Sequence, residues 1–421
     1  MQTLEQLRTG ALAGTRHLRL SQGLTEFPRE IFELADTLEV LDLSGNALEA
    51  LPDDLYRLDK LRILFASNNA FTELPAGLGR CPSLTMIGFK ANRIHTVPAE
   101  ALPIGLRWLI LTDNALDTLP DEIGKCARLQ KLMLAGNRLE SLPQTLAACR
   151  SLELLRISAN RLTALPDWLL AMPRLSWLAF AGNPFCAEPQ AAAHPDIDWQ
   201  ALTLETKLGE GASGVIYRAH HRDGKTLAVK IFKGAVTSDG LPSSEMQACL
   251  AAGQHPNLIP VLGRVTGHPE GRDVLALDLI DADFAPLAGP PDFETCTRDV
   301  YATGARFDLE TVRRIALGIA SAAGHLHARG LMHGDLYAHN ILTAQNREPV
   351  IGDFGAASFY EADPGHALQR LEVCAFGCLL EELVARCPDA DADMSRLAAS
   401  CLSETPHKRP LFEDIVNRLH P

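Results

Sequence analysis

The 421-residue sequence lacks the features that would place it in a membrane, on nucleic acid or in an oxidising compartment. No apolar run approaches the roughly 20 residues that a membrane-spanning helix needs, and no basic patch with an apolar core marks a secretory signal at the N-terminus. A basic excess is missing too, because the net charge is −13, which argues against a nucleic-acid binder. The ten cysteines show no paired metal-ligand spacing, so we expect reduced thiols in a cytoplasmic protein. Delivery into a host cell is compatible with the same sequence.

An internal repeat occupies the first half of the chain. Asparagines recur at 46, 69, 92, 114, 137, 160 and 183, with spacings of 23, 23, 22, 23, 23 and 23 residues. Each stands in the frame LxxLxLxxNxLxxLP, as in LRILFASNNAFTELP at 61–75. This frame resembles the leucine-rich repeat family over residues 17–186, with seven full copies and a divergent first one behind a cap at 1–16. A single repeat cannot bury its own apolar face, so we expect the copies to stack into an α/β solenoid.

Alternation within each repeat predicts two faces of a short strand. Leu61, Leu64 and Ala66 should point inward while the residues between them face out, and the repeat asparagines should bond backbone groups in a ladder. The outward positions are unusually apolar: Val40, Ile63, Phe65, Met86, Trp108, Ile110, Met133, Leu154 and Trp177. Because exposed apolar patches mark interfaces, we expect this concave face to bind a protein substrate or regulator, or the chain's own second domain. Scattered surface hydrophobes are the alternative.

Three cysteines, Cys81, Cys126 and Cys149, share one repeat position that other repeats fill with leucine or methionine. This favours small buried hydrophobes over a redox or metal role. The periodicity ends near Phe185, and the Pro- and Ala-rich stretch 187–198 is interpreted as a linker. Residues 1–184 hold 19 basic and 20 acidic side chains, so nearly all of the negative charge belongs to the second half.

The second half carries motifs of phosphoryl-transfer chemistry in order. Gly209, Gly211 and Gly214 form G-x-G-x-x-G, in which glycines let backbone amides approach phosphate. Lys230 follows within the strand-like run LAVKIF, and Glu245 opens a helical stretch. Alone, each of these signals is weak. The decisive segments are LMHGDLYAHNIL at 331–342 and IGDFGAAS at 351–358, which together with the earlier motifs resemble the protein kinase family over residues 199–421.

The resemblance implies a bilobal α+β domain that uses ATP with Mg²⁺, or Mn²⁺ in its place. Lys230 would bind the α- and β-phosphates, held by Glu245, and Asp335 would accept or orient the hydroxyl proton. Asn340 and Asp353 would hold the metal ions. The nucleotide-binding residues would be Gly209, Gly211, Gly214, Ile216, Ala228, Lys230, Leu277, Asp278 and Ile280. The auxiliary residues would be His333, Tyr337, His339, Phe354 and Gly355, with His333, Phe354 and Cys249 in the hydrophobic column that joins the lobes.

Several positions depart from the kinase pattern. Gly334 replaces the arginine that meets an activation-loop phosphate, and Tyr337 replaces the lysine that neutralises the γ-phosphate, a role that His339 could partly fill. The activation segment is short: Glu372, in place of the usual helix aspartate, lies only 19 residues after Asp353. Because no A-P-E follows, Arg409 lacks its customary carboxylate partner.

The activation segment also offers few acceptors, since Ser358 and Tyr360 are the hydroxyls near the DFG motif. A phosphorylation switch there is therefore disfavoured. The sequence predicts a cytoplasmic Ser/Thr-directed protein kinase whose repeats bind a substrate or regulator. Two alternatives stay open: a kinase-like small-molecule phosphotransferase, suggested by H-G-D-x-x-x-x-N and the missing peptide shelf, and an ATP-binding pseudokinase scaffold.

Overall fold

The computed structural model describes residues 2–186, 194–234, 236–361 and 363–420, which fall into two compact units. The first unit comprises Met1–Leu155 and Asn160–Met172, and the second comprises Arg156–Ala159 and Pro173–Pro421. The division therefore lies inside the last repeats, earlier than the boundary expected from the periodicity. The end of the repeat region belongs with the second unit.

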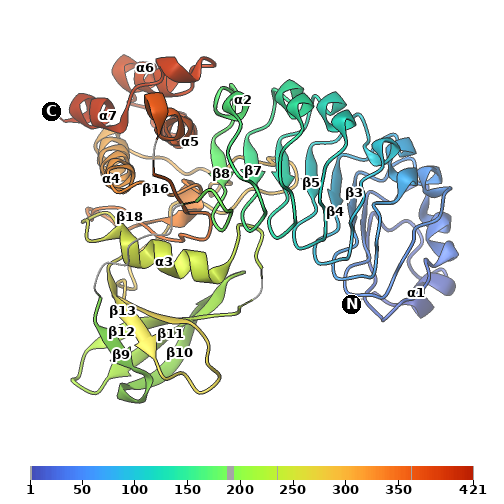
Figure 1. The fold of residues 1–421 in the computed structure, drawn as a ribbon, viewed down its shortest axis with the longest axis horizontal. Helices are drawn as coiled ribbons and strands as arrows, with labels where there is room; N and C mark the ends of the chain where they lie inside the picture. Colours follow the sequence, from blue (N-terminus) through green and yellow to red (C-terminus); the bar gives the residue numbers. More distant parts are fainter. Residues whose placement is uncertain (1, 187–193, 235, 362, 421) are drawn as a thin grey trace. The chain divides into compact units, whose positions relative to one another are not determined.

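The first unit begins with helix α1 (Leu4–Arg8), whose capping box joins Thr3 and Gln6. One short strand follows per repeat (Figure 1): β1 (His17–Arg19), β2 (Val40–Asp42), β3 (Ile63–Phe65), β4 (Met86–Gly88), β5 (Trp108–Ile110), β6 (Lys131–Met133) and β7 (Leu154–Arg156). The returns between strands are the 3-10 helices η1 (Arg29–Leu34), η2 (Leu55–Arg57), η3 (Ala76–Arg80), η4 (Ala99–Ala101), η5 (Asp121–Lys125) and η6 (Gln144–Ala148), and helix α2 (Asp167–Leu170).

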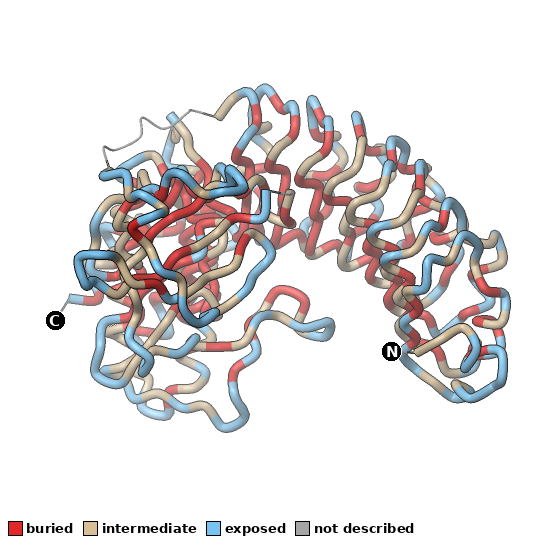
Figure 2. The backbone as a smooth tube through the Cα atoms, turned by 90° about the horizontal axis from the view of Figure 1, so that it is seen from below, coloured by how far each residue is buried: buried red, intermediate tan, exposed pale blue. Residues whose placement is uncertain are grey.

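The strands pair in parallel with residues of equal repeat position in register, as Leu64 opposite Ile87 shows. Leu61, Leu64 and Ala66 are fully buried, which confirms the predicted inward face. The tube in Figure 2 shows this buried core running from strand to strand. The asparagine ladder is confirmed as well: Asn69 Nδ2 donates to the Leu43 carbonyl at 2.9 Å, and its Oδ1 accepts from the Leu48 amide at 2.9 Å. Each ladder contact satisfies backbone groups that a strand of three residues leaves unpaired.

The turn before each ladder asparagine requires a left-handed backbone. The residue that precedes the asparagine has positive φ in every one of the seven copies: Gly45, Asn68, Ala91, Asp113, Gly136, Ala159 and Gly182. Glycine occupies three of these positions at no steric cost, whereas alanine at two of them tolerates strain that the stacked repeats must offset.

The apolar stripe is less exposed than the sequence suggested. Ile63, Met86, Met133, Leu154 and Trp177 are buried, and Val40, Phe65, Trp108 and Ile110 are half-buried, so none of the nine is fully exposed. Neighbouring repeats cover one another, as where the Phe65 ring fills the space that a side chain at Gly88 would need. Similarly, Trp108 Nε1 donates to Met133 Sδ at 3.3 Å.

The three repeat cysteines are buried, as expected for small hydrophobes. Burial raises the pKa of Cys81 and of Cys126 to about 11, and that of Cys149 to about 12. Such thiols stay protonated at neutral pH, so they are poor nucleophiles and poor metal ligands.

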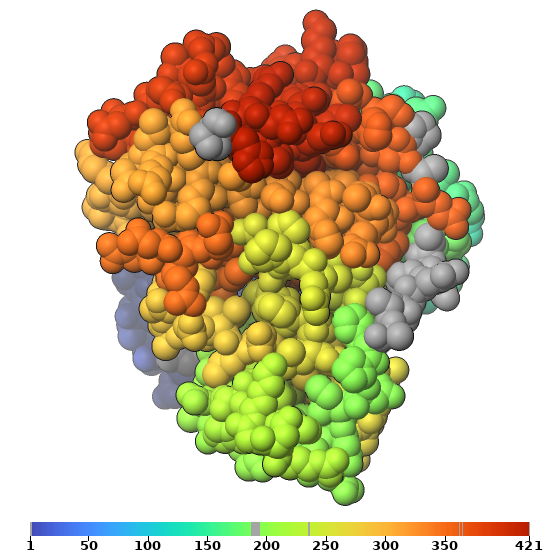
Figure 3. Space-filling model, turned by 90° about the vertical axis from the view of Figure 1, so that its left-hand side faces the viewer, coloured from blue at the N-terminus to red at the C-terminus, as the bar shows by residue number. Residues whose placement is uncertain are grey.

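The second unit contains a mixed sheet of six strands in the order β10-β11-β12-β14-β13-β9. Its strands are β9 (Asp196–Asp198), β10 (Leu202–Glu210), β11 (Gly214–His221), β12 (Thr226–Phe232), β13 (Val261–Thr266) and β14 (Val274–Leu277). Part of the stretch interpreted as a linker is thus a strand, since β9 pairs in parallel with β13. Residues 187–193 of that linker lie outside the described residues. Helix α3 (Pro242–Ala252) lies between this sheet and the helical lobe (Figure 3).

The helical lobe follows the sheet in sequence. Its helices are α4 (Leu309–His327), α5 (Ala367–Val384), α6 (Ala392–Cys401) and α7 (Phe412–Leu419). Short strands β15 (Ala285–Pro286), β17 (Ile341–Thr343) and β18 (Val350–Ile351) form one small sheet, and β16 (Leu331–Met332) pairs with β19 (Ser358–Phe359). Asp308 caps α4 by accepting from the Thr311 amide at 2.7 Å. The loops between these short strands carry the predicted catalytic motifs.

The last repeat strand, β8 (Trp177–Ala179), belongs to the second unit. The Ile157 amide donates to the Ala179 carbonyl at 2.8 Å, and the Ala159 amide donates to the Ala181 carbonyl at 2.7 Å. The segment 156–159 and the strand β8 therefore form one hydrogen-bonded piece of repeat, which we call the terminal repeat segment (156–159 and 173–181).

Candidate active site

A cleft in the second unit gathers most of the predicted nucleotide-binding motifs. Its lining comes from the glycine-rich turn, strands β12 and β14, helix α3 and the DFG motif: Gly211, Ala212, Ser213, Gly214, Ile216, Lys230, Thr237, Asp239, Glu245, Cys249, Ile259, Val261, Leu275, Leu277, Gly352, Asp353, Phe354 and Gly355. Of the residues predicted from sequence, Gly209, Ala228, Asp278 and Ile280 are not among those that line it. Ala228 lies next to the cleft, paired with Leu277 across β12 and β14.

Two of the motif glycines have different physical roles. A Cβ at Gly214 would lie 2.7 Å from the Ile231 carbonyl oxygen, so only glycine lets β11 lie this close to β12. A Cβ at Gly211 would meet nothing within 4 Å, so that residue faces open space in the cleft. Gly214 is therefore needed for packing, and Gly211 leaves room for a ligand.

Lys230 of β12 forms an ion pair with Glu245 of α3, both largely buried. Burial by itself lowers the pKa of Lys230, but the negative charges of Glu245 and Asp353 outweigh it and raise the pKa overall. The ammonium group thus stays charged inside the cleft. Lys230 and Glu245 are 15 residues apart in the sequence, and they come into direct contact because α3 packs beside the sheet.

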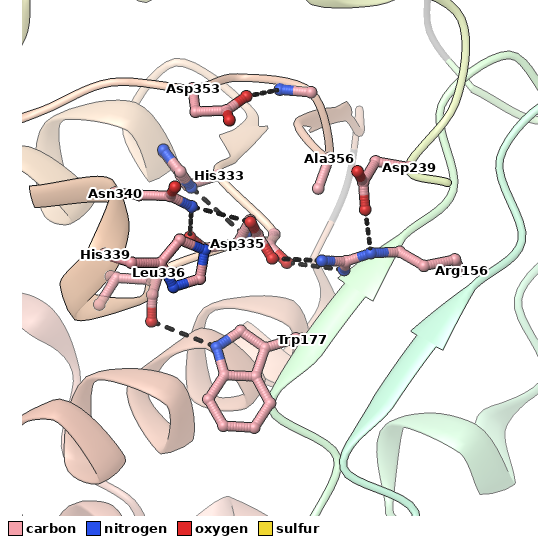
Figure 4. A network of polar contacts seen from close by, with 12 residues as sticks. Arg156, Trp177, Asp239, His333, Asp335, Leu336, His339, Asn340, Asp353 and Ala356 are labelled. Carbon is pink, nitrogen blue, oxygen red and sulfur yellow. Dashed lines mark hydrogen bonds and ion pairs between the residues drawn. The ribbon is translucent and has the colours of Figure 1, made fainter. Parts of the chain in front are cut away.

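Asp335 of the catalytic loop 333–340 is held through both of its carboxylate oxygens, Oδ1 by Arg156 from outside the loop and Oδ2 by Asn340 within it (Figure 4). Asn340 Nδ2 donates to Asp335 Oδ2 at 2.8 Å and to the Asp335 carbonyl at 2.9 Å. The Asp335 side chain keeps 17% of its surface exposed. Although burial raises its pKa, nearby positive groups, Arg156 above all, lower it overall.

Glu372 of α5, which stands in place of the usual helix aspartate, organises the backbone of this loop. Its Oε1 accepts from the Gly334 amide at 2.7 Å and its Oε2 from the His333 amide at 3.3 Å. Burial would raise the pKa of Glu372, but the hydrogen bond with His327 and the other donors lower it overall. The Glu372 carboxylate is therefore anionic, and it holds the backbone of the catalytic loop at His333 and Gly334.

The DFG motif lies directly beside the catalytic loop. The Gly352 amide donates to the Asn340 carbonyl at 3.2 Å, and the rings of His333 and Phe354 lie 5.1 Å apart, as the predicted hydrophobic column requires. Asp353 has a left-handed backbone with φ 57° and an exposed side chain that accepts from the Gly355 amide. Its carboxylate is thereby presented to the cleft.

The oxygen donors at this point suit a hard divalent cation. Asn340 and Asp353 offer an amide and a carboxylate oxygen, and Mg²⁺ typically takes one or two carboxylates with substrate phosphates completing its shell. Among the described residues, no group of three or more His, Cys, Asp or Glu could hold a metal without such help. The residues therefore fit a metal that arrives with a nucleotide.

Sequence reasoning missed two residues of the site, Arg156 and Asp239. Arg156 lies at the end of β7, and its Nε donates to Asp239 at 2.7 Å, its Nη1 to the Gly334 carbonyl at 2.9 Å, and its Nη2 to Asp335 (Figure 4). The sequence offered little signal, because the equivalent strand positions of the preceding repeats carry Arg19, Asp42, Phe65, Gly88, Ile110 and Met133, so an arginine already occurs at this position.

The positions that depart from the kinase pattern contact the terminal repeat segment. The Trp177 ring stacks on Tyr337 with centroids 4.2 Å apart, and its Nε1 donates to the Leu336 carbonyl at 3.2 Å. The hydroxyl of Ser358 accepts from the Phe180 amide at 2.9 Å. Arg409, which lacks its carboxylate partner, donates instead to the Pro173 carbonyl at 2.6 Å.

Two further predicted residues are committed elsewhere. His339 is bonded to Asp299 at 2.7 Å, and although burial lowers the pKa of His339, this bond raises it overall. The ring is therefore oriented by Asp299 and not free to replace the missing lysine. The Tyr360 hydroxyl is bonded to His327 at 2.6 Å and its side chain is half-buried. Ser358 is fully buried and therefore closed to a modifying enzyme in this structure.

Comparison with known families agrees with this geometry. Residues 202–374 match the protein kinase domain, and residues 37–58, 104–162 and 127–185 match leucine-rich repeats. The chain therefore contains leucine-rich repeats followed by a protein kinase domain.

The individual relatives share less than 30% of their residues with this chain over the matched regions. A protein named as a serine/threonine-protein kinase in Acanthamoeba polyphaga mimivirus is 26% identical over 184 residues, covering 44% of this chain and 31% of the relative. An LRR receptor-like serine/threonine-protein kinase of Arabidopsis thaliana is 28% identical over 186 residues, covering 43% of this chain and 18% of the relative. This chain thus spans less than a third of the length of either relative. In the part of the chain that the structure describes, no helix has the length and hydropathy needed to cross a bilayer.

Proposed function

We propose that this chain is an ATP-dependent protein kinase that phosphorylates serine or threonine hydroxyls on a protein substrate. One observation carries the proposal. The Lys230–Glu245 ion pair is closed in the cleft that also presents Asp353, directly beside the loop that holds Asp335 on Asn340. In protein kinases this ion pair and the DFG aspartate must both be in place for transfer.

The cleft would hold ATP by its glycine-rich turn and by charge. Backbone amides near Gly211 approach the phosphates, and Lys230 binds the α- and β-phosphates while Glu245 holds its ammonium group. The adenine ring would lie between Ile216 and Leu277, which line the cleft from β11 and β14. The segment that follows β14, from Asp278 to Ile280, would supply backbone hydrogen bonds to the adenine.

Asn340 and Asp353 would hold the metal, with Mg²⁺ as the expected ion and Mn²⁺ as the alternative. When bound, the ion neutralises phosphate charge that develops during transfer. The contribution of the chain is positioning: Asn340 is fixed by its bonds to Asp335, and the Asp353 backbone is held beside Gly352 and Gly355.

Asp335 orients the acceptor. Its exposed carboxylate edge accepts the hydrogen bond of a substrate hydroxyl, whose oxygen attacks the γ-phosphorus as the bond from that phosphorus to the bridging oxygen of ADP breaks. The hydroxyl proton passes to Asp335, and ADP leaves with the electron pair. Because Tyr337 brings no charge beside the γ-phosphate, we expect modest turnover.

The test is transfer of labelled γ-phosphate from Mg-ATP by the purified full-length chain. The acceptors are a generic basic protein, the chain itself and a panel of small alcohols. Asp335→Asn should lose about 10²–10⁴-fold in rate, the usual cost of removing a positioned base. Asp389→Asn, an exposed carboxylate of the same lobe, is the control and should leave the rate unchanged. Label on alcohols alone would favour a small-molecule phosphotransferase, and ATP binding without any label would favour a scaffold.

We further propose that the repeats bind a protein substrate or regulator on their concave face. The half-buried members of the apolar stripe keep surface for a partner; they are Val40, Phe65, Trp108 and Ile110. The ten free thiols and the use of ATP support a cytoplasmic setting for this activity. Substituting Trp108 and Ile110 by serine should weaken phosphorylation of the physiological protein substrate without changing that of a short peptide. Equal loss on both acceptors would contradict the recruiting role.

The chain's own kinase domain is the second partner that we propose for this face, because Trp177 of the stripe already stacks on Tyr337. If the remaining stripe restrains the kinase domain, the same double substitution raises autophosphorylation. An unchanged rate of autophosphorylation would contradict this intramolecular role.

A further inference from the structure

The guanidinium of Arg156 is buried beside the catalytic loop of the second unit, and all three of its nitrogens are hydrogen-bonded. Its side chain is 2% exposed, and its three nitrogens donate to Asp239, to the Gly334 carbonyl and to Asp335. A buried arginine is costly unless its charge and its N–H groups find partners. Here each of the three nitrogens has one, from two carboxylates and one carbonyl. The position of Arg156 between Asp239, the Gly334 carbonyl and Asp335 therefore indicates a role other than packing.

The loop itself supplies no free cation. Position 334 is glycine and position 337 is tyrosine, and the Tyr337 ring is held by Trp177. The charge of His339 is matched by Asp299. Among the described residues, Arg156 is the arginine or lysine that forms an ion pair with the Asp335 carboxylate.

The segment that carries Arg156 is seated on this loop by backbone contacts. Gly334 has φ 74°, and a Cβ there would lie 2.6 Å from both the Leu178 and the Ala356 carbonyl oxygens. The strand β8 thus occupies the space that a side chain at position 334 would need. Ser358 accepts from two successive amides of the same strand, Phe180 and Ala181. The glycine in place of the family's arginine is a consequence of this close approach.

We propose that Arg156 is a positioning residue for phosphoryl transfer, a cation supplied by the repeat region that holds Asp335 against Asn340. This inference rests on the proposed function and deepens it, because it makes the kinase lobe incomplete without the terminal repeat segment. The opposite pulls of Arg156 on Oδ1 and Asn340 on Oδ2 fix the plane of the carboxylate. Each oxygen keeps a lone pair for the substrate hydroxyl.

The burial of Arg156 and the exposure of Asp335 distinguish the positioning role from two others, direct contact with the γ-phosphate and inhibition. At 2% exposure the Arg156 side chain has almost no free surface with which to contact a γ-phosphate. An inhibitory plug would cover the acceptor carboxylate, yet Asp335 keeps 17% of its surface exposed with Arg156 in place. The arginine lies beside the carboxylate, on the side away from Asn340 (Figure 4).

The test compares Arg156→Ala, Arg156→Lys and the control Arg161→Ala in the full-length chain. Arg161 is an exposed arginine five residues further on. Because small misplacements of a reacting group cost about 10²-fold, Arg156→Ala should lower kcat by about 10²-fold with little change in KM for ATP. Arg156→Lys should recover part of the loss, and ethylguanidinium should restore activity to Arg156→Ala where sodium chloride of equal ionic strength does not. Arg161→Ala should match the parent chain.

A rise in kcat or an unchanged kcat in Arg156→Ala would overturn the proposal, as would a loss that neither lysine nor ethylguanidinium relieves. Crystal structures of the parent chain and Arg156→Ala decide the case even if no transfer is seen in either. The Asp335 carboxylate should turn away from Asn340 in the variant, and an unmoved carboxylate overturns the inference. An inactive parent chain would instead refute the proposed function. If Arg156→Ala does not fold, Arg156→Lys takes its place in both measurements.

Discussion

Substitution of Gly334 by alanine tests whether the terminal repeat segment packs on the catalytic loop in solution. The backbone at Gly334 is left-handed, with φ 74°, which costs an L-residue about 1–2 kcal/mol. The new Cβ would also lie 2.6 Å from two carbonyl oxygens, of Leu178 and of Ala356, and neither is the end of a flexible side chain. Overpacking of this kind costs a further 1–3 kcal/mol or so. Together the two effects predict a loss of about 2–5 kcal/mol of unfolding free energy.

The matched control is Gly304→Ala. Gly304 has nearly the same backbone, φ 78°, but a Cβ there would meet nothing within 4 Å. It should therefore lose only the backbone contribution of about 1–2 kcal/mol. Urea denaturation followed by tryptophan fluorescence gives both values, with the transitions of the two units fitted separately because they need not unfold together. Equal losses in the two variants would refute the reasoning, since they would mean that no carbonyl of the strand β8 crowds Gly334.

The other predictions concern ionisable groups that the fold has buried. Glu245→Gln should lower kcat by at least about 10-fold and weaken ATP binding, because Lys230 loses the partner that holds it; equal kinetics in a γ-phosphate transfer assay would contradict this. The depressed pKa of Glu372 stabilises the folded state above its unfolded pKa of about 4.3, and this stability is lost as pH falls towards the folded pKa. Glu372→Gln should therefore flatten the loss of stability below about pH 4.3 in acid titrations of melting temperature, and a parallel curve would argue against an anionic Glu372. Cys149, whose pKa burial raises to about 12, should resist iodoacetamide at pH 8 until the first unit is unfolded, as mass spectrometry would show.

Local chemistry explains why much of the architecture could be predicted. Each repeat places its apolar residues and its asparagine at fixed spacing, and the ladder forms between neighbours, so Asn69 needs only the adjacent copies to find its partners. The motifs at Lys230, Asp335 and Asp353 can also be recognised in the sequence, because phosphate and metal binding require particular residue types at particular spacings. For Glu245 the sequence predicted the correct partner, since a kinase lobe brings α3 onto its sheet.

The exposure of the repeat face was harder to predict. The alternation assigned Ile63 to the outward side, yet it is only 3% exposed, and its neighbours on the adjacent strands are the bulky Val40 and Met86. The alternation along a strand predicts the side of the sheet to which a side chain points, whereas the exposure of that side chain depends on the size of its neighbours. The same limit applies to the linker, part of which became β9 because the edge of the six-stranded sheet offered it a partner in β13.

The sequence by itself determined the two classes of domain and identified the motif residues that we propose to bind ATP, because periodicity and motif spacing are local properties of a chain. The tertiary structure alone decided how the departures from the kinase pattern are resolved. Arg156 and Asp335 are 179 residues apart, and no local pattern encodes their contact. A buried carboxylate requires a matching charge, and a loop with glycine at 334 and tyrosine at 337 can obtain it only from an element that folding brings alongside.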